Sequence, residues 1–167
     1  MFKLIKLFLT FNLIKLISST CVPQIVDMNK PYQEQNISVE YNPTNVVQQD
    51  GILQLILTQS GGTLIKLDNQ IQYGKIDVRM KVANGNSIVS AFELFSDQTK
   101  DEVDFEMVQN HAYPNRMIQT TFYYKGIPLY NVNDIYIDTG IDLAYSYNTY
   151  TYIWTKDFYE WRFNDNF

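Results

Sequence analysis

The sequence predicts an all-β domain built as a sandwich or a barrel. Three observations support this. Beyond Cys21, apolar and polar residues alternate in short runs, and no stretch keeps a helical period. Turn-forming residues separate the runs, as at Gly61–Gly62 and Asn84–Asn86. Tyr and Phe are abundant, with 13 and 10 copies, and both favour strands.

Bulk composition limits the class of protein. A length of 167 residues suits one domain, and 46% hydrophobic residues are enough for a core. A net charge of −5 argues against a nucleic-acid partner, which requires a clustered basic face. Cys21 and His111 are the only cysteine and histidine, so we expect no internal disulfide, no metal and no cofactor.

The first twenty residues read as a secretory signal peptide. Met1–Thr20 has a lysine near its start, continues with apolar residues and ends in small ones. Its uninterrupted apolar run, Leu7–Ile14, is too short to span a bilayer as a helix. An amphipathic helix on a membrane surface and a plain N-terminal helix are the alternatives. The triplet Asn36–Ser38 is an N-glycosylation sequon, which also favours secretion.

After this segment, the order of the elements follows from the alternating runs. Residues 21–50 are polar and rich in Pro, Asn and Gln, so we expect a lead-in segment there with at most one edge strand. Eight runs are then expected to form strands, at residues 52–58, 63–67, 76–82, 87–95, 102–108, 117–124, 150–155 and 158–163.

The run Glu102–Glu106 is the strongest functional signal. Successive side chains of a strand point to opposite faces, so Glu102, Asp104 and Glu106 share one face while the apolar residues between them enter the core. Crowded like charges raise the pKa of at least one carboxyl group. A general acid needs such a raised pKa near neutral pH, and a pair of carboxylates carries out glycoside hydrolysis.

The spacing of these acids sets a geometric condition. Retaining glycosidases hold their two carboxyl groups about 5–5.5 Å apart. Residues 102 and 106 lie about 13 Å apart along an ideal strand. Their side chains must therefore lean toward each other over Asp104. The strand alone leaves open an alternative, which is a solvent-facing strand that simply carries acids.

Several blocks of the chain resemble the family 16 glycoside hydrolases, in particular the fungal cell-wall branch that transfers chitin chains onto glucan. The blocks stand in the family's order, and the resemblance covers roughly residues 51–167. They are Tyr73–Lys81, Ser87–Asp97, Asp101–Glu106, Gln119–Gly126 and Tyr150–Asp165. The resemblance implies a β-jelly-roll sandwich of the concanavalin-like type, with a groove on its concave face.

The resemblance also implies a role for each acid. Glu102 would be the nucleophile that forms a glycosyl-enzyme. Glu106 would protonate the leaving oxygen and then deprotonate the acceptor. Asp104 would form a hydrogen bond with the nucleophile and so adjust the charge of the nucleophile. The acceptor would be water in hydrolysis and a sugar hydroxyl in transglycosylation.

Sugar contacts and partners follow from the same resemblance. Gln119, Tyr123 and Trp161 would bind substrate, although Trp161 reads equally well as a core residue. The partner would be a polysaccharide, chitin or β-glucan, met outside the cell or in its wall. We expect a monomer with no membrane span after signal removal. A non-catalytic glycan-binding or degenerate wall protein is the alternative function, and a fragment that does not fold alone is a third.

A few positions depart from the family pattern. Residues 107–116 contain no glycine where the family has a Gly-rich turn, Asn148 replaces a common His, and Ile153 replaces a common Asp. A single cysteine cannot form the N-terminal disulfides of the fungal branch. The chain ends at Phe167, where family domains continue for several strands, so the sequence predicts a sandwich truncated at its C-terminal end.

Overall fold

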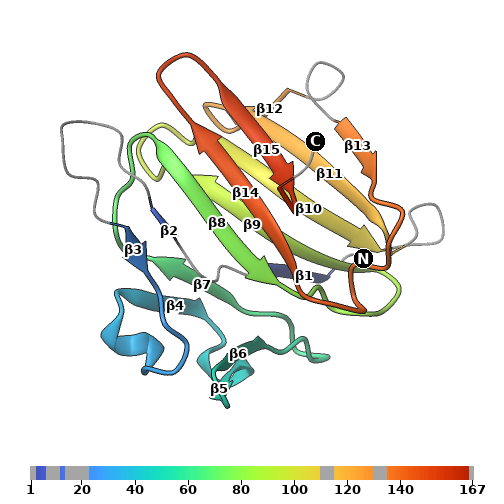
Figure 1. Cartoon of the computed structure of the whole chain (residues 1–167). Coiled ribbons are helices and arrows are strands. Elements are labelled where there is room, and N and C mark those ends of the chain that lie inside the picture. The colour runs from blue at the N-terminus through green and yellow to red at the C-terminus, as the bar shows by residue number, and fades with distance from the viewer. Residues whose placement is uncertain (1–2, 7–11, 14–22, 110–114, 130–134, 166–167) are drawn as a thin grey trace.

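The computed structural model describes residues 3–6, 12–13, 23–109, 115–129 and 135–165 (Figure 1). Most of the predicted signal peptide, Cys21 and His111 lie outside the described residues. Two facing sheets enclose the core, which confirms the predicted all-β sandwich. Two single-turn 3-10 helices also occur, η1 (Tyr32–Glu34) and η2 (Pro43–Asn45). In the described part of the chain, no helix has the length and apolar character to cross a bilayer.

The larger sheet carries the acidic strand near its middle. Its strands follow the order β1-β9-β10-β11-β12, and β13 also pairs with β11. They are β1 (Lys3–Lys6), β9 (Ile88–Phe95), β10 (Glu102–Gln109), β11 (Met117–Tyr124), β12 (Ile127–Pro128) and β13 (Ile135–Asp138). Strand β10 is antiparallel to both β9 and β11, so the acidic residues have a neighbouring strand on each side.

A second sheet covers the core face of β9–β11 (Figure 1). It consists of β8 (Gly74–Met80), β14 (Asn148–Trp154) and β15 (Tyr159–Phe163), in the order β15-β14-β8. The Tyr152 ring lies 4.8 Å from that of Phe92 and 4.9 Å from that of Phe105. The Tyr152 hydroxyl donates to the carbonyls of Phe92 (2.8 Å) and Val103 (2.9 Å). This tyrosine therefore ties the two sheets together directly behind the acidic strand.

Short strand pairs form the N-terminal part of the fold. They are β2 (Asn12–Leu13) with β3 (Gln24–Ile25), β4 (Ile37–Tyr41) with β7 (Leu64–Leu67), and β5 (Val46–Gln49) with β6 (Ile52–Leu55). The prediction of at most one strand in residues 21–50 is wrong, because β3, β4 and β5 all lie there. Strand β4 pairs with β7, which is distant in the sequence, and Ser38 stands opposite Lys66. The local sequence does not reveal such a pairing.

Candidate active site

Strand β10 has opposite chemistry on its two faces, as its alternation predicted. Three apolar side chains enter the core and are almost fully buried: Val103, Phe105 and Met107. The carboxylates of Glu102, Asp104 and Glu106 share the other face. Asp104 is 3% exposed, whereas the two glutamates are partly open to solvent. The acid in the middle therefore sits deepest.

Cross-strand pairing defines what surrounds each carboxylate. On β11, Tyr123 stands opposite Glu102, and Gln119 stands opposite Glu106. These two predicted sugar-contacting residues therefore lie beside the acids. On β9, Glu93 stands opposite Asp104. Sequence reasoning missed this fourth carboxylate, since it belongs to another strand and only the register brings it to the site.

Glu93 joins Glu102 and Asp104 in a tight group, in which one oxygen of each residue lies within 4.8 Å of the others. Crowded carboxylates are neutralised either by a bound cation or by a shared proton. Protonation is the direct way for buried like charges to relieve their repulsion. We therefore treat the group as one that shares protons.

The protonated member is Asp104. Its burial, reinforced by the negative charges of Glu102, Glu93 and Glu106, raises the pKa of Asp104 to about 10. The predicted rise from like-charge crowding is confirmed, although burial is the larger cause. A side-chain hydrogen bond with Glu102 also favours the protonated form. At neutral pH, Asp104 is thus a neutral acid whose carboxyl group can donate a hydrogen bond.

Asp101 fixes the end of β10 next to Glu102. Its Oδ1 accepts the backbone N–H of Lys125 at 2.8 Å, and its Oδ2 accepts the hydroxyl of Thr99 at 2.7 Å. The hydrogen bond from the Lys125 backbone, followed by that from Thr99, lowers the pKa of Asp101. These contacts tie the β9–β10 turn to the β11–β12 turn. They hold Glu102 and Tyr123 in register.

Trp161 approaches β10 from the core side. Its ring lies 6.4 Å from that of Tyr152, and its Nε1 donates to the main-chain carbonyl of Asp104 at 3.0 Å. Trp161 also packs against the buried core. It therefore supports the acidic strand from behind, whereas Gln119 and Tyr123 stand on the carboxylate face. Of the two interpretations of Trp161, the structure favours the core residue.

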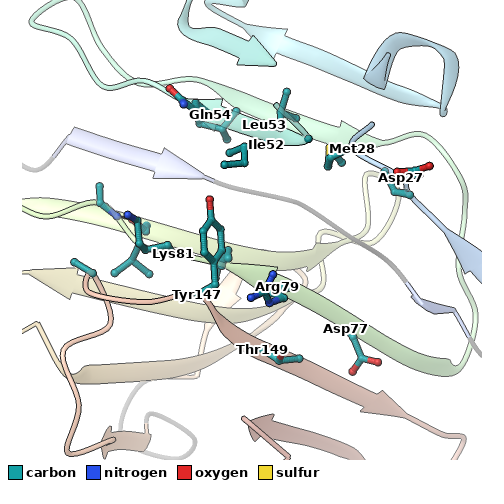
Figure 2. Close-up of a pocket in the computed structure, with 18 of the residues that line it drawn as sticks. Asp27, Met28, Ile52, Leu53, Gln54, Asp77, Arg79, Lys81, Tyr147 and Thr149 are labelled. Carbon is teal, nitrogen blue, oxygen red and sulfur yellow. Dashed lines mark hydrogen bonds between the residues drawn. The ribbon is translucent and has the colours of Figure 1, made fainter. Parts of the chain in front are cut away.

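A cleft of about 1210 Å³ lies away from these acids, on the outer face of β8 and β14 (Figure 2). Ile76 and Val78 turn into the core, so the residues that alternate with them face the cleft. There Lys75 Nζ pairs with Asp77 Oδ2 at 3.1 Å, and Arg79 lies 5.1 Å from the centre of the Tyr147 ring. The charged side chains of this cleft have both signs and contact one another or an aromatic ring. The size of the cleft is therefore not enough to make it the active site. We place the candidate active site at the carboxylates of β10.

A β-sandwich with crowded carboxylates on a central strand has the kind of acidic groups that glycoside hydrolysis requires. The chain belongs to the glycosyl hydrolases family 16, which residues 33–167 match. It is 31% identical to Crh-like protein 3 of Botryotinia fuckeliana over 121 residues, which is 72% of this chain and 26% of that protein. It is 34% identical to Crh-like protein 2 of Aspergillus fumigatus over 114 residues, 68% of this chain and 25% of that protein.

Solved structures agree with this assignment. The fold is similar to that of the Crh5 transglycosylase in complex with NAG, with a TM-score of 0.73 and 25% identity, over 84% of this chain and 55% of that one. The resemblance to the fungal branch of the family is thereby confirmed. The chain spans about a quarter of the length of the two curated relatives.

Proposed function

We propose that this chain is a retaining glycan hydrolase or transglycosylase that acts outside the cell on wall polysaccharide, with chitin or β-glucan as its substrate. One observation carries the proposal. Three carboxylates share one face of β10, and the central one, Asp104, is kept neutral by burial while its neighbours are partly open to solvent. Retaining chemistry needs one ionised and one protonated carboxyl group, and Glu102 and Glu106, on either side of Asp104, would supply this pair. A solvated acidic strand would not need a buried acid between two open ones.

The first step forms a covalent intermediate on Glu102. Its ionised carboxylate attacks the anomeric carbon, while Glu106 gives its proton to the glycosidic oxygen and the C–O bond breaks. In the second step Glu106 takes the proton of an acceptor hydroxyl, which attacks the same carbon and frees Glu102. Asp104 donates a hydrogen bond to Glu102 and so fixes its orientation.

Neighbouring residues are suited to hold the sugar. Tyr123 and Gln119 lie opposite the two glutamates in the β10–β11 pairing. A tyrosine ring offers an apolar face with a polar tip, and a glutamine amide both donates and accepts hydrogen bonds. An extracellular location is supported by the sequon residue Asn36, which is exposed immediately before β4.

A transfer assay tests the proposal. The purified chain is mixed with a chitin or β-glucan donor and a fluorescent oligosaccharide acceptor. We expect label in longer products for the wild type and for Asp77→Asn, a matched carboxylate-to-amide change on the other sheet, but not for Glu102→Gln. If folded wild-type protein transfers no label and releases no reducing ends, the chain is not an enzyme. Retained glycan binding would then identify a glycan-binding protein.

A further inference from the structure

The mechanism above gives no role to Glu93, although this residue belongs to the same carboxylate group. Glu93 is 8% exposed and stands directly opposite Asp104 across the β9–β10 pair. One of its oxygens lies within 4.8 Å of an oxygen of Asp104 and of one of Glu102. Burying a carboxylate among other carboxylates is costly. A proton shared within the group lowers this cost.

We propose that Glu93 is a positioning residue that shares the proton of Asp104 with Glu102 and accepts its hydrogen bond while Glu102 carries the sugar. This inference rests on the proposed function. Asp104 Oδ1 supports it, because this atom is buried and has no hydrogen-bond partner among the described residues. The Asp104 carboxyl therefore has a second oxygen available for a neighbour other than Glu102.

The proton balance of the cycle shows why a second acceptor is useful. In the free protein, a side-chain hydrogen bond joins Asp104 to Glu102. Once a glycosyl bond forms, the carboxylate of Glu102 becomes a neutral ester, which is a much weaker acceptor. Glu93 is then the remaining member of the group, and the hydrogen bond of Asp104 turns to it. No proton leaves the group, and release of the sugar restores the first arrangement.

The titratable and polar groups that face Glu93 come from three neighbouring strands of the two sheets. Strand β10 places its three acids on the same face as Glu93. Strand β11, on the other side of β10, adds the phenol of Tyr123, the amide of Gln119 and the hydroxyl of Thr121 to that face. On the core side, burial, followed by the charges of Asp104 and Glu93, raises the pKa of Tyr152 of β14. Strand β1, which pairs with β9 at Ile88–Ala91, has two lysines in its sequence. The titratable or polar groups that these strands place around Glu93 are Glu102, Asp104, Glu106, Gln119, Thr121, Tyr123 and Tyr152.

Carboxyl-carbon NMR tests this inference without any need for catalysis. The intact chain is titrated as wild type, as Glu93→Gln and as the matched control Asp77→Asn, with the Asp104 signal assigned by its loss in Asp104→Asn. We expect the midpoint of Asp104 to fall by about one pH unit or more in Glu93→Gln, which is a tenfold loss of proton affinity. It should not move in Asp77→Asn. An unchanged midpoint in folded Glu93→Gln overturns the proposal.

Two further measurements cover the remaining outcomes. If Glu93→Gln does not fold, the wild-type titration decides, because shared protons require the Glu93 and Asp104 signals to move through common transitions. Independent transitions overturn the proposal. A titration curve that changes when a chelator is added also overturns it, since a cation would then hold the group.

Activity provides a separate readout. The acidic limb of the kcat/KM profile should move to lower pH in Glu93→Gln, because the carboxylate group then contains one fewer negative charge. Glu93→Asp keeps the charge and should keep the position of that limb. An acidic limb that Glu93→Gln leaves in place overturns the catalytic part of the proposal. An inactive wild type would contradict the proposed function, while the NMR titration would still decide whether Glu93 shares the proton.

Discussion

The two sheets of this protein have outer faces built from the same alternation but with opposite electrostatics. On β8, Lys75, Asp77 and Arg79 face the cleft of Figure 2, as does Lys81 just beyond the strand, and these charges of both signs have partners. On β9 and β10, the face turned away from the core carries four acids. Alternation alone therefore makes a polar outer face, and the choice of charges decides whether that face is electrostatically balanced or crowded with like charges.

The difference also concerns stability. Mixed charges on an exposed face contribute little in either direction. Like charges that are buried, as Asp104 and Glu93 are, oppose folding unless a proton neutralises them. Folded proteins tend to break local rules at functional sites, where stability is given up for activity. If the acids of β9 and β10 form the proposed active site, substitutions there should affect activity and stability in opposite directions.

The largest effect is expected for Glu106→Gln on the acidic face. Loss of a general acid should lower glycan transfer by about 10²–10⁴-fold, whereas Asp77→Asn on the other sheet should change it by less than about twofold. A donor with a dinitrophenyl leaving group needs no proton at departure, so formation of the glycosyl-enzyme from it should be much less impaired. An equal loss with both donors would contradict the role of Glu106 as an acid.

Asp104→Asn should stabilise the protein at high pH. Burial raises the pKa of Asp104 to about 10, above its unfolded value of 3.8. Its contribution to stability is therefore fully present below pH 3.8 and is lost as the pH rises toward 10. An amide mimics the neutral acid at every pH. We expect the variant to gain about 1–3 kcal/mol over the wild type at pH 8 and little at pH 4, while its transfer rate falls. Denaturant unfolding at the two pH values measures this, and a gain that is equal at both contradicts it.

The tyrosines behind the acidic strand form a matched pair. Tyr152→Phe removes the hydroxyl that bonds the carbonyls of Phe92 and Val103, so we expect a loss of about 1–2 kcal/mol in the free energy of unfolding. The hydroxyl of Tyr150 is buried without a hydrogen-bond partner in the described part of the chain. Tyr150→Phe should therefore be neutral or stabilising by up to about 1 kcal/mol. Equal losses for the two variants would show that the sheets are not tied through Tyr152.

The smallest effect is expected on the balanced face. Lys75→Met removes a partly exposed ion pair with Asp77, which also accepts a hydrogen bond from Thr151. The free energy of unfolding should fall by less than about 1 kcal/mol, and high salt should narrow the difference from the wild type. A larger loss that persists in high salt would mean that this face is as constrained as the acidic one.

The sequence was sufficient where the information is local. All eight expected runs are strands, and β11 occupies the predicted residues 117–124. The shared face of the three β10 acids followed from strand period alone. The sequence did not predict the short strand β13, because its four residues are mostly exposed. It did not predict Glu93 as a site residue either, because the sequence of a single strand does not define its register with a neighbour. The placement of Trp161 needed the packing of the second sheet against the first.

Trapping the covalent intermediate would examine the assignment of β10 as a retaining active site. A 2-fluoro oligosaccharide donor with a good leaving group slows the second step, because the fluorine destabilises the positively charged transition state. The protein is then digested and its peptides are measured by mass spectrometry. We predict a mass increase of one glycosyl unit on the peptide that contains Glu102, at Glu102 itself. Labelling of Glu106 instead, or no labelling of folded and glycan-bound protein, would contradict the assignment.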